Sequence, residues 1–163
     1  MYRGRLRNSA QDQCLLRILA YGKIGLQILR RIAMVDPEPE VTVMTELVRP
    51  THSNHHGTLF AGEALSMMAS AAFTAASRHA REKVVLAAVQ DMRFYEPIPV
   101  GSLFSVEARV IDAGRSSMMV DVTGRRENPE TGDAATVAQG QFQMVAVNQD
   151  GRPKKFTSRE IIT

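Results

Sequence analysis

The pattern of hydrophobic and polar positions predicts one long helix, from Thr58 to Ala80. This segment holds eight alanines together with Met and Leu and has no proline, a composition that favours a helix of about six turns. It is apolar on nearly every side until Arg78, which is typical of a buried helix, but it lacks the run of about 18 apolar residues that a membrane span needs. We therefore expect other parts of the chain to wrap this helix.

Strands are predicted on both sides of the helix. Before it, the segment VTVMTELV, residues 41–48, reads as a first strand. After it, apolar and polar side chains alternate, as in residues 104–110. Four strands joined by short turns form an antiparallel sheet with one apolar face, and the helix is the only large apolar segment available to cover that face. The later strands are predicted at 84–95, 104–110, 116–127 and 134–147, with turns at 112–114 and 128–133.

Length and composition are those of a single domain. The 163 residues are 44% apolar and 23% charged, which is ordinary for a soluble protein large enough to bury a core. The single cysteine, Cys14, excludes an internal disulfide bond and a zinc cluster built from cysteines. We therefore expect a reducing compartment and a cytoplasmic location.

Charge divides the chain into unlike parts. Residues 1–34 contain seven Lys or Arg and one Asp, whereas the remainder has 13 basic and 16 acidic residues. The basic character belongs to the N-terminal extension, which argues against nucleic-acid binding by the domain. If residues 14–34 are helical, one face is basic, and such a segment can contact a membrane surface or a partner. The alternative, which we prefer, is that Met34 is the true start and the preceding segment is spurious or disordered.

These patterns give the expected domain organisation. The folded domain is expected in the long central part alone, because the linker before it combines prolines with charges. The parts are a basic extension (1–34), a linker (35–40), the domain (41–153) and a basic tail (154–163).

Five motifs follow one another through the domain, from about Val41 to Pro153. They are Pro50; Asn54 with Gly57 and Leu59-Phe60-Ala61-Gly62; Phe94 with Pro97 and Val100-Gly101; Gly114-Arg115-Ser116-Ser117; and Phe142 with Val145-Ala146-Val147 and Asp150-Gly151-Arg152. Each is weak evidence alone, but all five in this order and at compatible spacing are specific. Together they resemble the hotdog-fold acyl-CoA thioesterases, in particular the group of the bacterial short- and medium-chain acyl-CoA hydrolases and the mammalian cytosolic acyl-CoA hydrolase.

The resemblance implies a hotdog fold, an α+β fold in which a five-stranded antiparallel sheet curves around one long central helix. It also implies homodimers whose sheets join edge to edge, with tetramers or hexamers common. Active sites in such proteins lie at the dimer interface and use residues of two chains. Pairing between identical edge strands would also cover an exposed sheet edge.

Thioester hydrolysis needs a polarised carbonyl group, and the start of the helix can provide it. The first N–H groups of a helix have no partner within it and carry a partial positive charge. By the resemblance, the amides of Ala61 and Gly62 polarise the carbonyl, and Asn54 holds the substrate or the attacking water. An asparagine in a turn before a helix can also be only a cap, and both roles stay open.

The chain departs from the family pattern at Ala69, seven residues after Gly62. The resemblance implies an aspartate or glutamate there, acting as general base or nucleophile, and an alanine methyl group cannot accept a proton. Glu63 lies about 120° round the helix and roughly 9 Å along it from this position, so it cannot stand in on the same face. The alternative is that Glu63 only stabilises the helix, because the helix dipole favours a carboxylate in the first turn.

Other groups near the helix start are candidates for the missing role. His55, His56 and Asp91 could accept a proton from water, whereas Ser66 and Ser70 could only hold the water. A metal site made by His52, His55 and His56 is not expected, because the loop contains no cysteine or carboxylate partner.

Coenzyme binding is predicted further along the chain. By the resemblance, Gly114, Arg115, Ser116 and Ser117 contact the pantetheine or phosphate region. Arg115, Arg152, Lys154 and Lys155 are candidate phosphate contacts, although the two lysines could equally be a solvated tail. The methionines Met67, Met68, Met118 and Met119 line an adaptable acyl pocket or, as we prefer, mostly fill the core.

We therefore expect an acyl-CoA thioesterase that hydrolyses a fatty acyl-CoA to free acid and CoA. No separate cofactor is expected, because coenzyme A is part of the substrate. The alternative is a non-catalytic homologue that binds acyl-CoA, and Ala69 is the residue that separates the two. A hotdog hydratase is a more distant alternative, since the histidine and acid that would abstract a proton are not evident.

Overall fold

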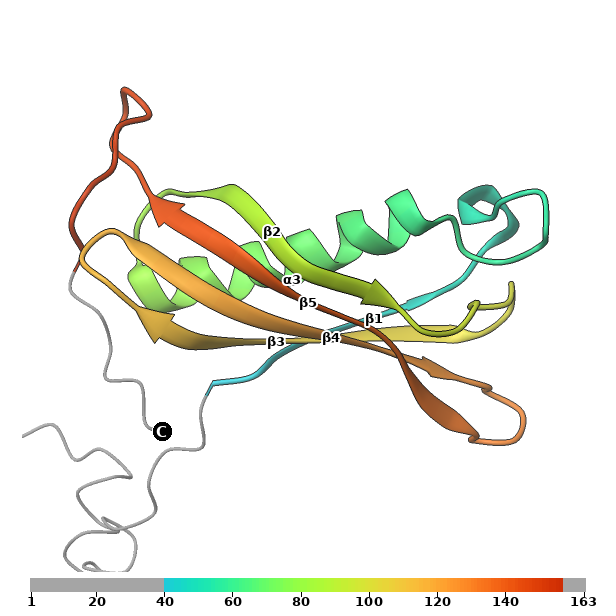
Figure 1. Cartoon of the computed structure of the whole chain (residues 1–163). Helices are drawn as coiled ribbons and strands as arrows, with labels where there is room; N and C mark the ends of the chain where they lie inside the picture. The colour runs from blue at the N-terminus through green and yellow to red at the C-terminus, as the bar shows by residue number, and fades with distance from the viewer. Residues whose placement is uncertain (1–39, 157–163) are drawn as a thin grey trace, which may run out of the picture. The chain divides into compact units, whose positions relative to one another are not determined.

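The computed structural model describes residues 40–156 of the chain. The predictions for the N-terminal extension, the linker up to residue 39 and the tail beyond residue 156 lie outside the described residues. The elements are β1 (Thr42–Leu47), the 3-10 helix η1 (Pro50–His52), α3 (Ala61–Ala80), β2 (Val84–Phe94), β3 (Leu103–Ala113), β4 (Ser117–Glu127) and β5 (Ala134–Ala146) (Figure 1).

The strands form one antiparallel sheet in the order β1-β3-β4-β5-β2, and α3 lies across one face of it (Figure 1). This confirms the predicted hotdog architecture of a five-stranded sheet and one long helix. The consecutive strands β2 and β3 are not neighbours, because β2 pairs with β5 and β3 pairs with β1. The segment 95–102 between them is therefore not a hairpin turn, and it packs instead against the loop before α3.

The helix begins three residues later than the predicted Thr58. Two backbone hydrogen bonds explain the difference, since the Leu59 N–H donates to the Ile98 carbonyl at 2.7 Å and the Val100 N–H donates to the Gly57 carbonyl at 3.1 Å. Thr58 and Leu59 are thereby held extended beside the β2–β3 connection. A local helix preference is weaker than these long-range bonds combined with the burial of Leu59.

Within residues 40–156, one face of α3 is buried. The strands pack against the helix as expected, and among the described residues of one protomer they cover one side of it. On the opposite side Phe73 is 49% exposed. The buried residues are mostly small, as the alanine-rich sequence predicts, and they are Ala64, Met68, Ala71, Ala72, Ala75, Ala76 and Ala80.

The alternation along the strands is confirmed. Phe104, Val106 and Ala108 of β3 are fully buried beneath α3, as is Phe142 of β5. Strand β3 runs to Ala113, so the turn predicted at residues 112–114 lies at 114–116 instead. A bulge between Val110 and Asp112 shifts the register with β4 and allows the longer hairpin.

Strand β2 forms an apolar edge of the sheet. Of its residues only Val84 is buried, and four large apolar side chains are between 36% and 45% exposed: Val85, Leu86, Val89 and Phe94. An exposed apolar edge favours pairing with another strand. Within residues 40–156 no helix has both the length and the hydrophobicity required to cross a membrane.

Candidate functional site

The first turn of α3 presents unpaired backbone amides. The Phe60 N–H donates to the His52 carbonyl at 2.9 Å and the Ala64 N–H donates to the Phe60 carbonyl at 3.1 Å. Phe60 is the N-cap and its side chain makes no capping bond. Among the described residues nothing accepts a hydrogen bond from the three amides between them, those of Ala61, Gly62 and Glu63. Such amides, together with the helix dipole, can bind an oxygen that becomes negatively charged.

Asn54 organises the loop that leads into α3. Its Oδ1 accepts from the His56 N–H at 2.9 Å and from the Thr58 N–H at 3.3 Å, and its Nδ2 donates to the Thr58 hydroxyl at 3.0 Å. It does not cap the helix, because the N-cap is Phe60. These bonds fix the loop whose far end carries the unpaired amides, which gives Asn54 a structural task in addition to the one predicted.

Ala69 is half-buried and packs against the core, and helical geometry places it on the flank of α3 toward β2. Met67 lines a groove between α3 and β1 on the other flank, and two helical steps of 100° place Ala69 nearly opposite Met67. The β2 edge next to this flank is the exposed one. A carboxylate at this position would therefore lie toward the exposed β2 edge of the sheet. Because the residue is alanine, position 69 provides no acid there.

Glu63 lies on the wrong flank to replace this acid, as the helical spacing predicts. It belongs to a groove of about 260 Å³ between α3 and β1. The groove also holds a histidine–carboxylate pair, in which His52 Nδ1 is 3.9 Å from Glu46 Oε1. This pair was not predicted from the sequence. Arg49 bridges the two, at 2.9 Å from Glu46 and 3.2 Å from His52 Nε2. The groove is lined by Met44, Thr45, Glu46, His52, Glu63, Ser66, Met67 and Ser70.

The other proton acceptors are placed differently. His55 and His56 are exposed in the turn before α3, with ring centroids 3.8 Å apart. Asp91 lies in a hollow with Asp121, Gln139 and Gln141, on the sheet face opposite α3, and cannot reach the start of the helix. In the part of the chain that the structure describes, no three His, Cys, Asp or Glu residues are close enough to hold a metal ion.

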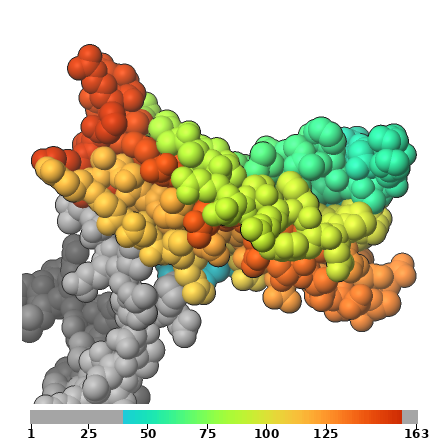
Figure 2. Space-filling model, viewed as in Figure 1, coloured from blue at the N-terminus to red at the C-terminus, as the bar shows by residue number. Residues whose placement is uncertain are grey.

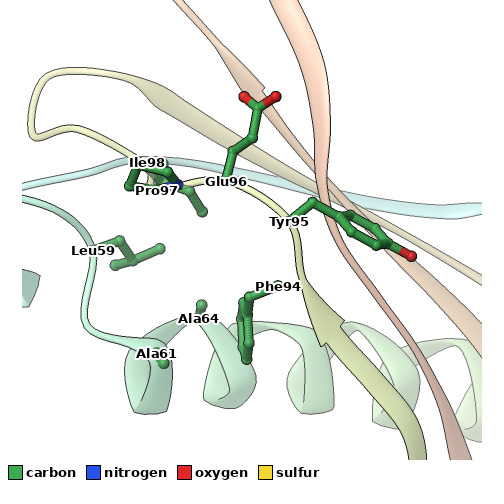
Figure 3. Close-up of a pocket in the computed structure, with 8 residues that line it drawn as sticks. All are labelled: Leu59, Ala61, Ala64, Phe94, Tyr95, Glu96, Pro97 and Ile98. Atoms are coloured by element: carbon green, nitrogen blue, oxygen red, sulfur yellow. The ribbon is translucent and has the colours of Figure 1, made fainter.

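An apolar cavity of about 320 Å³ adjoins the unpaired amides. Figure 3 shows Phe94 extending toward α3 beside Ala64, whereas the Tyr95 ring and the Glu96 carboxylate point away from the cavity. No pattern in the sequence predicts this cavity. It is not lined by methionines, and Met68 and Met118 lie in the core. Its lining residues are Leu59, Ala61, Ala64, Phe94, Tyr95, Glu96, Pro97 and Ile98.

The predicted coenzyme-binding residues come together at the other end of α3. In the β3–β4 turn the Gly114 N–H donates to the Ser117 carbonyl at 2.8 Å, and the Arg115 carbonyl accepts from the Phe156 N–H at 3.2 Å. Lys154 Nζ is 2.7 Å from Glu82 Oε1, just beyond the end of α3. The turn is thus bonded to the C-terminal segment that contains Arg152 and Lys154.

The two groups of predicted site residues are far apart within one chain. The helix between them has 20 residues and is therefore about 30 Å long. Figures 1 and 2 show the C-terminal segment, in red, at one end of the sheet and the loop before α3, in cyan to green, at the other. A single chain therefore does not bring the amides of Ala61 and Gly62 near Arg115 or Lys154.

Comparison with known proteins identifies close relatives. Residues 56–132 match the family model of the Thioesterase superfamily. The chain is 34% identical over 116 residues to an uncharacterized acyl-CoA thioester hydrolase of Zymomonas mobilis, and the match covers 71% of this chain and 76% of that protein.

Solved structures give the same result. One neighbour is an apo-hexameric acyl-CoA thioesterase, with a TM-score of 0.72 and 34% identity, over 76% of this chain and 79% of the other. Another is the acyl-CoA hydrolase of Staphylococcus aureus in complex with butyryl coenzyme A and coenzyme A, with a TM-score of 0.68 and 30% identity, over 72% of each chain. Alanine variants of that enzyme at one asparagine and one aspartate, fifteen positions apart, have also been solved.

Proposed function

This chain belongs to the thioesterase superfamily, among its acyl-CoA thioester hydrolases, and we propose that it hydrolyses a fatty acyl-CoA at the start of α3. The observation that carries the proposal is the set of unpaired amides in the first turn of α3, next to an apolar cavity. A thioester offers one carbonyl oxygen for such amides and one apolar chain for such a cavity.

The reaction needs a bound carbonyl group, an attacking water and an acceptor for the proton of that water. The amides of Ala61 and Gly62 bind the carbonyl oxygen and stabilise the negative charge that develops on it when water attacks the carbonyl carbon. The C–S bond then breaks, the acid is released, and the water's proton ends on the thiol of coenzyme A. Asn54, which fixes the approach to these amides, holds the substrate or the water.

Ala69 removes the group that would take the water's proton. The spacing between the substituted asparagine and aspartate of the S. aureus enzyme equals the spacing from Asn54 to Ala69. This supports the assignment of Ala69 to the acid's position. Of the remaining acceptors, Glu63 faces the β1 side, so His55 and His56 in the exposed turn before α3 are the better candidates.

Coenzyme binding requires a second chain. We place the dimer interface at the apolar β2 edge, where two-fold pairing is necessarily antiparallel. Since β2 starts near the C-terminal end of α3 and ends at the cavity, this pairing carries the partner's Arg115 and the partner's Lys154 toward the first turn of α3 in the other protomer. The partner's Gly114, Ser116, Ser117 and Arg152 approach with them.

This arrangement accounts for the separation of about 30 Å within one chain, because the acyl end and the phosphate end of the substrate then contact different protomers. The hexameric neighbours support a further assembly of such dimers. Glu82 holds Lys154, and a coenzyme phosphate would take its place. The cytoplasmic location and the absence of a separate cofactor remain predictions.

The alternative function is binding of acyl-CoA without turnover, and Ala69 favours it. Steady-state hydrolysis of a panel of acyl-CoAs, with binding measured in parallel, separates the two. Turnover by the parent protein supports hydrolysis, and replacement of His55, His56 and Glu63 in turn then identifies the proton acceptor. Binding without turnover, combined with hydrolysis by the Ala69→Asp variant, establishes the binding homologue. Neither binding nor turnover in either protein overturns the assignment of the site.

A further inference from the structure

We propose that the cavity beside the first turn of α3 is the acyl pocket and that Phe94 sets the length of acyl chain that it accepts. The cavity suits chains of up to about ten carbons. This inference rests on the proposed function, because it assumes that the thioester carbonyl binds at the amides of α3.

The walls of the cavity match an alkyl chain. Its floor consists of Leu59, Ala64 and Ile98, which are 7%, 1% and 4% exposed. Among the described residues, Glu96 is the one charged residue that lines it, and its carboxylate points away from the cavity (Figure 3). An apolar chain gains by entering such a cavity, whereas the phosphates of coenzyme A would lose their hydration there without finding a cation.

The position of the cavity next to the unpaired amides also supports the proposal. Ala61 both lines the cavity and carries one of the unpaired amides. A thioester whose carbonyl oxygen accepts from this amide therefore has its reacting carbon at the mouth of the cavity. Of its two substituents, only the acyl chain is apolar enough to enter, so the sulfur and the coenzyme point outward to the β2 edge.

The size of the cavity limits the chain. Its volume is about 320 Å³, and since a water molecule or a similarly sized methylene group takes roughly 30 Å³, it holds at most about ten such groups. The residues of the floor cannot easily move to enlarge the cavity, because the Leu59 N–H donates to the Ile98 carbonyl at 2.7 Å and Thr58 pairs with Pro99. The cavity therefore has a fixed depth on that side.

Phe94 is the lining residue whose size can be changed by substitution. It is the last residue of β2, its ring extends to α3 beside Ala64 (Figure 3), and it is 45% exposed. A change in its size alters the cavity without removing a buried core side chain of the protomer. Because Phe94 belongs to the β2 edge at which the dimer interface is proposed, light scattering must show that its variants keep the mass of the parent protein. Phe73 offers a matched control, because it is an aromatic residue of α3 with 49% exposure that does not line the cavity.

The test is the chain-length profile of the full-length protein, with acyl-CoAs from two to sixteen carbons. Within the cavity each added methylene group should improve kcat/KM about fourfold, up to about ten carbons, after which the gain stops. Phe94→Ala should move this limit to longer chains, and Phe94→Trp should move it to shorter ones. Phe73→Ala should leave the limit in place.

The outcome can be separated from that of the proposed function. If the parent protein binds acyl-CoA without turnover, the same profile is measured as binding affinity. Opposite shifts in the two Phe94 variants support the acyl pocket. Equal profiles in the parent and both Phe94 variants, with circular dichroism showing that both variants fold, overturn it while leaving the hydrolysis itself in place. An equal shift in Phe73→Ala also overturns it.

Discussion

Leu59 and Ile98 are joined by a backbone hydrogen bond of 2.7 Å between the Leu59 N–H and the Ile98 carbonyl, and both side chains are buried. The bond ties the loop before α3 to the β2–β3 connection. It delays the start of the helix to Ala61 and so sets where the unpaired amides lie. The same pair forms the floor of the apolar cavity.

Ile98→Ala should therefore cost both stability and activity. Ile98 is 4% exposed, and removal of such a side chain lowers the free energy of unfolding by about 2–5 kcal/mol. Urea unfolding at fixed protein concentration measures the loss. The matched control is Ile111→Ala, since Ile111 is 42% exposed and its removal should change the free energy by no more than about 0.5 kcal/mol. Equal losses in the two variants would contradict the packing role of Ile98.

Asn54→Ala should release the loop that leads into α3. The variant loses the acceptor for the amides of His56 and Thr58, which should lower the free energy of unfolding by about 1 kcal/mol. Hydrolysis should fall by more than this small loss explains, because the loop sets the approach to the amides of Ala61 and Gly62.

A matched control separates the two effects. Asn128 accepts in the same way from the Glu130 N–H, at 2.9 Å, in the β4–β5 turn. Asn128→Ala should lower stability by a similar amount and leave kcat unchanged. If kcat falls equally in both variants, Asn54 has no specific role in hydrolysis at the start of α3.

The sequence was sufficient for those features that depend on local pattern. The alternation of Phe104, Val106 and Ala108 places them on the buried face of β3, and the structure confirms it. The helical spacing of Glu63 and Ala69 also predicts that they occupy different flanks of α3, and the structure places Glu63 in the groove toward β1. Both inferences need only the period of a strand or a helix.

Features that depend on contacts across the fold could not be predicted. The start of α3 is set by Ile98, which is remote in sequence from Leu59. The pairing of His52 with Glu46 follows from the way η1 turns back toward β1, and no spacing rule signals it. The order of the motifs likewise does not show that Arg115 and Ala61 lie at opposite ends of α3, because order in the sequence does not determine distance in space.

Ala69→Asp should create or greatly increase hydrolysis. A positioned general base contributes between about a hundredfold and ten thousandfold to such a reaction, and the half-buried place of Ala69, toward the open β2 edge, can hold a carboxylate. Initial rates with one short acyl-CoA measure the gain. Ala69→Asn is the control of nearly equal shape, and it should not gain, because an amide cannot accept the proton.

The pH dependence provides an independent check. The gain in Ala69→Asp depends on an ionised carboxylate, so it should be full near pH 7 and disappear as the pH falls and the new side chain is protonated. An equal gain in Ala69→Asn, or a gain that does not change with pH, would show that the substitution acts through packing and not through proton transfer.

Val89→Lys should separate the protomers if the apolar β2 edge is the dimer interface. Val89 is 36% exposed at the middle of β2, and a lysine on an edge strand opposes pairing. Light scattering should show a smaller particle, and KM for acyl-CoA should rise at least about tenfold, because each site loses the partner's Arg115 and the partner's Lys154. Val43→Lys places the same charge on the other edge strand, β1, where Val43 is 59% exposed, and should leave the β2 interface and KM unchanged. A smaller Val89→Lys particle with unchanged KM would show that the substrate is held within one chain, although α3, about 30 Å long, separates Ala61 from Arg115. An unchanged mass would show that the β2 edge is not the dimer interface.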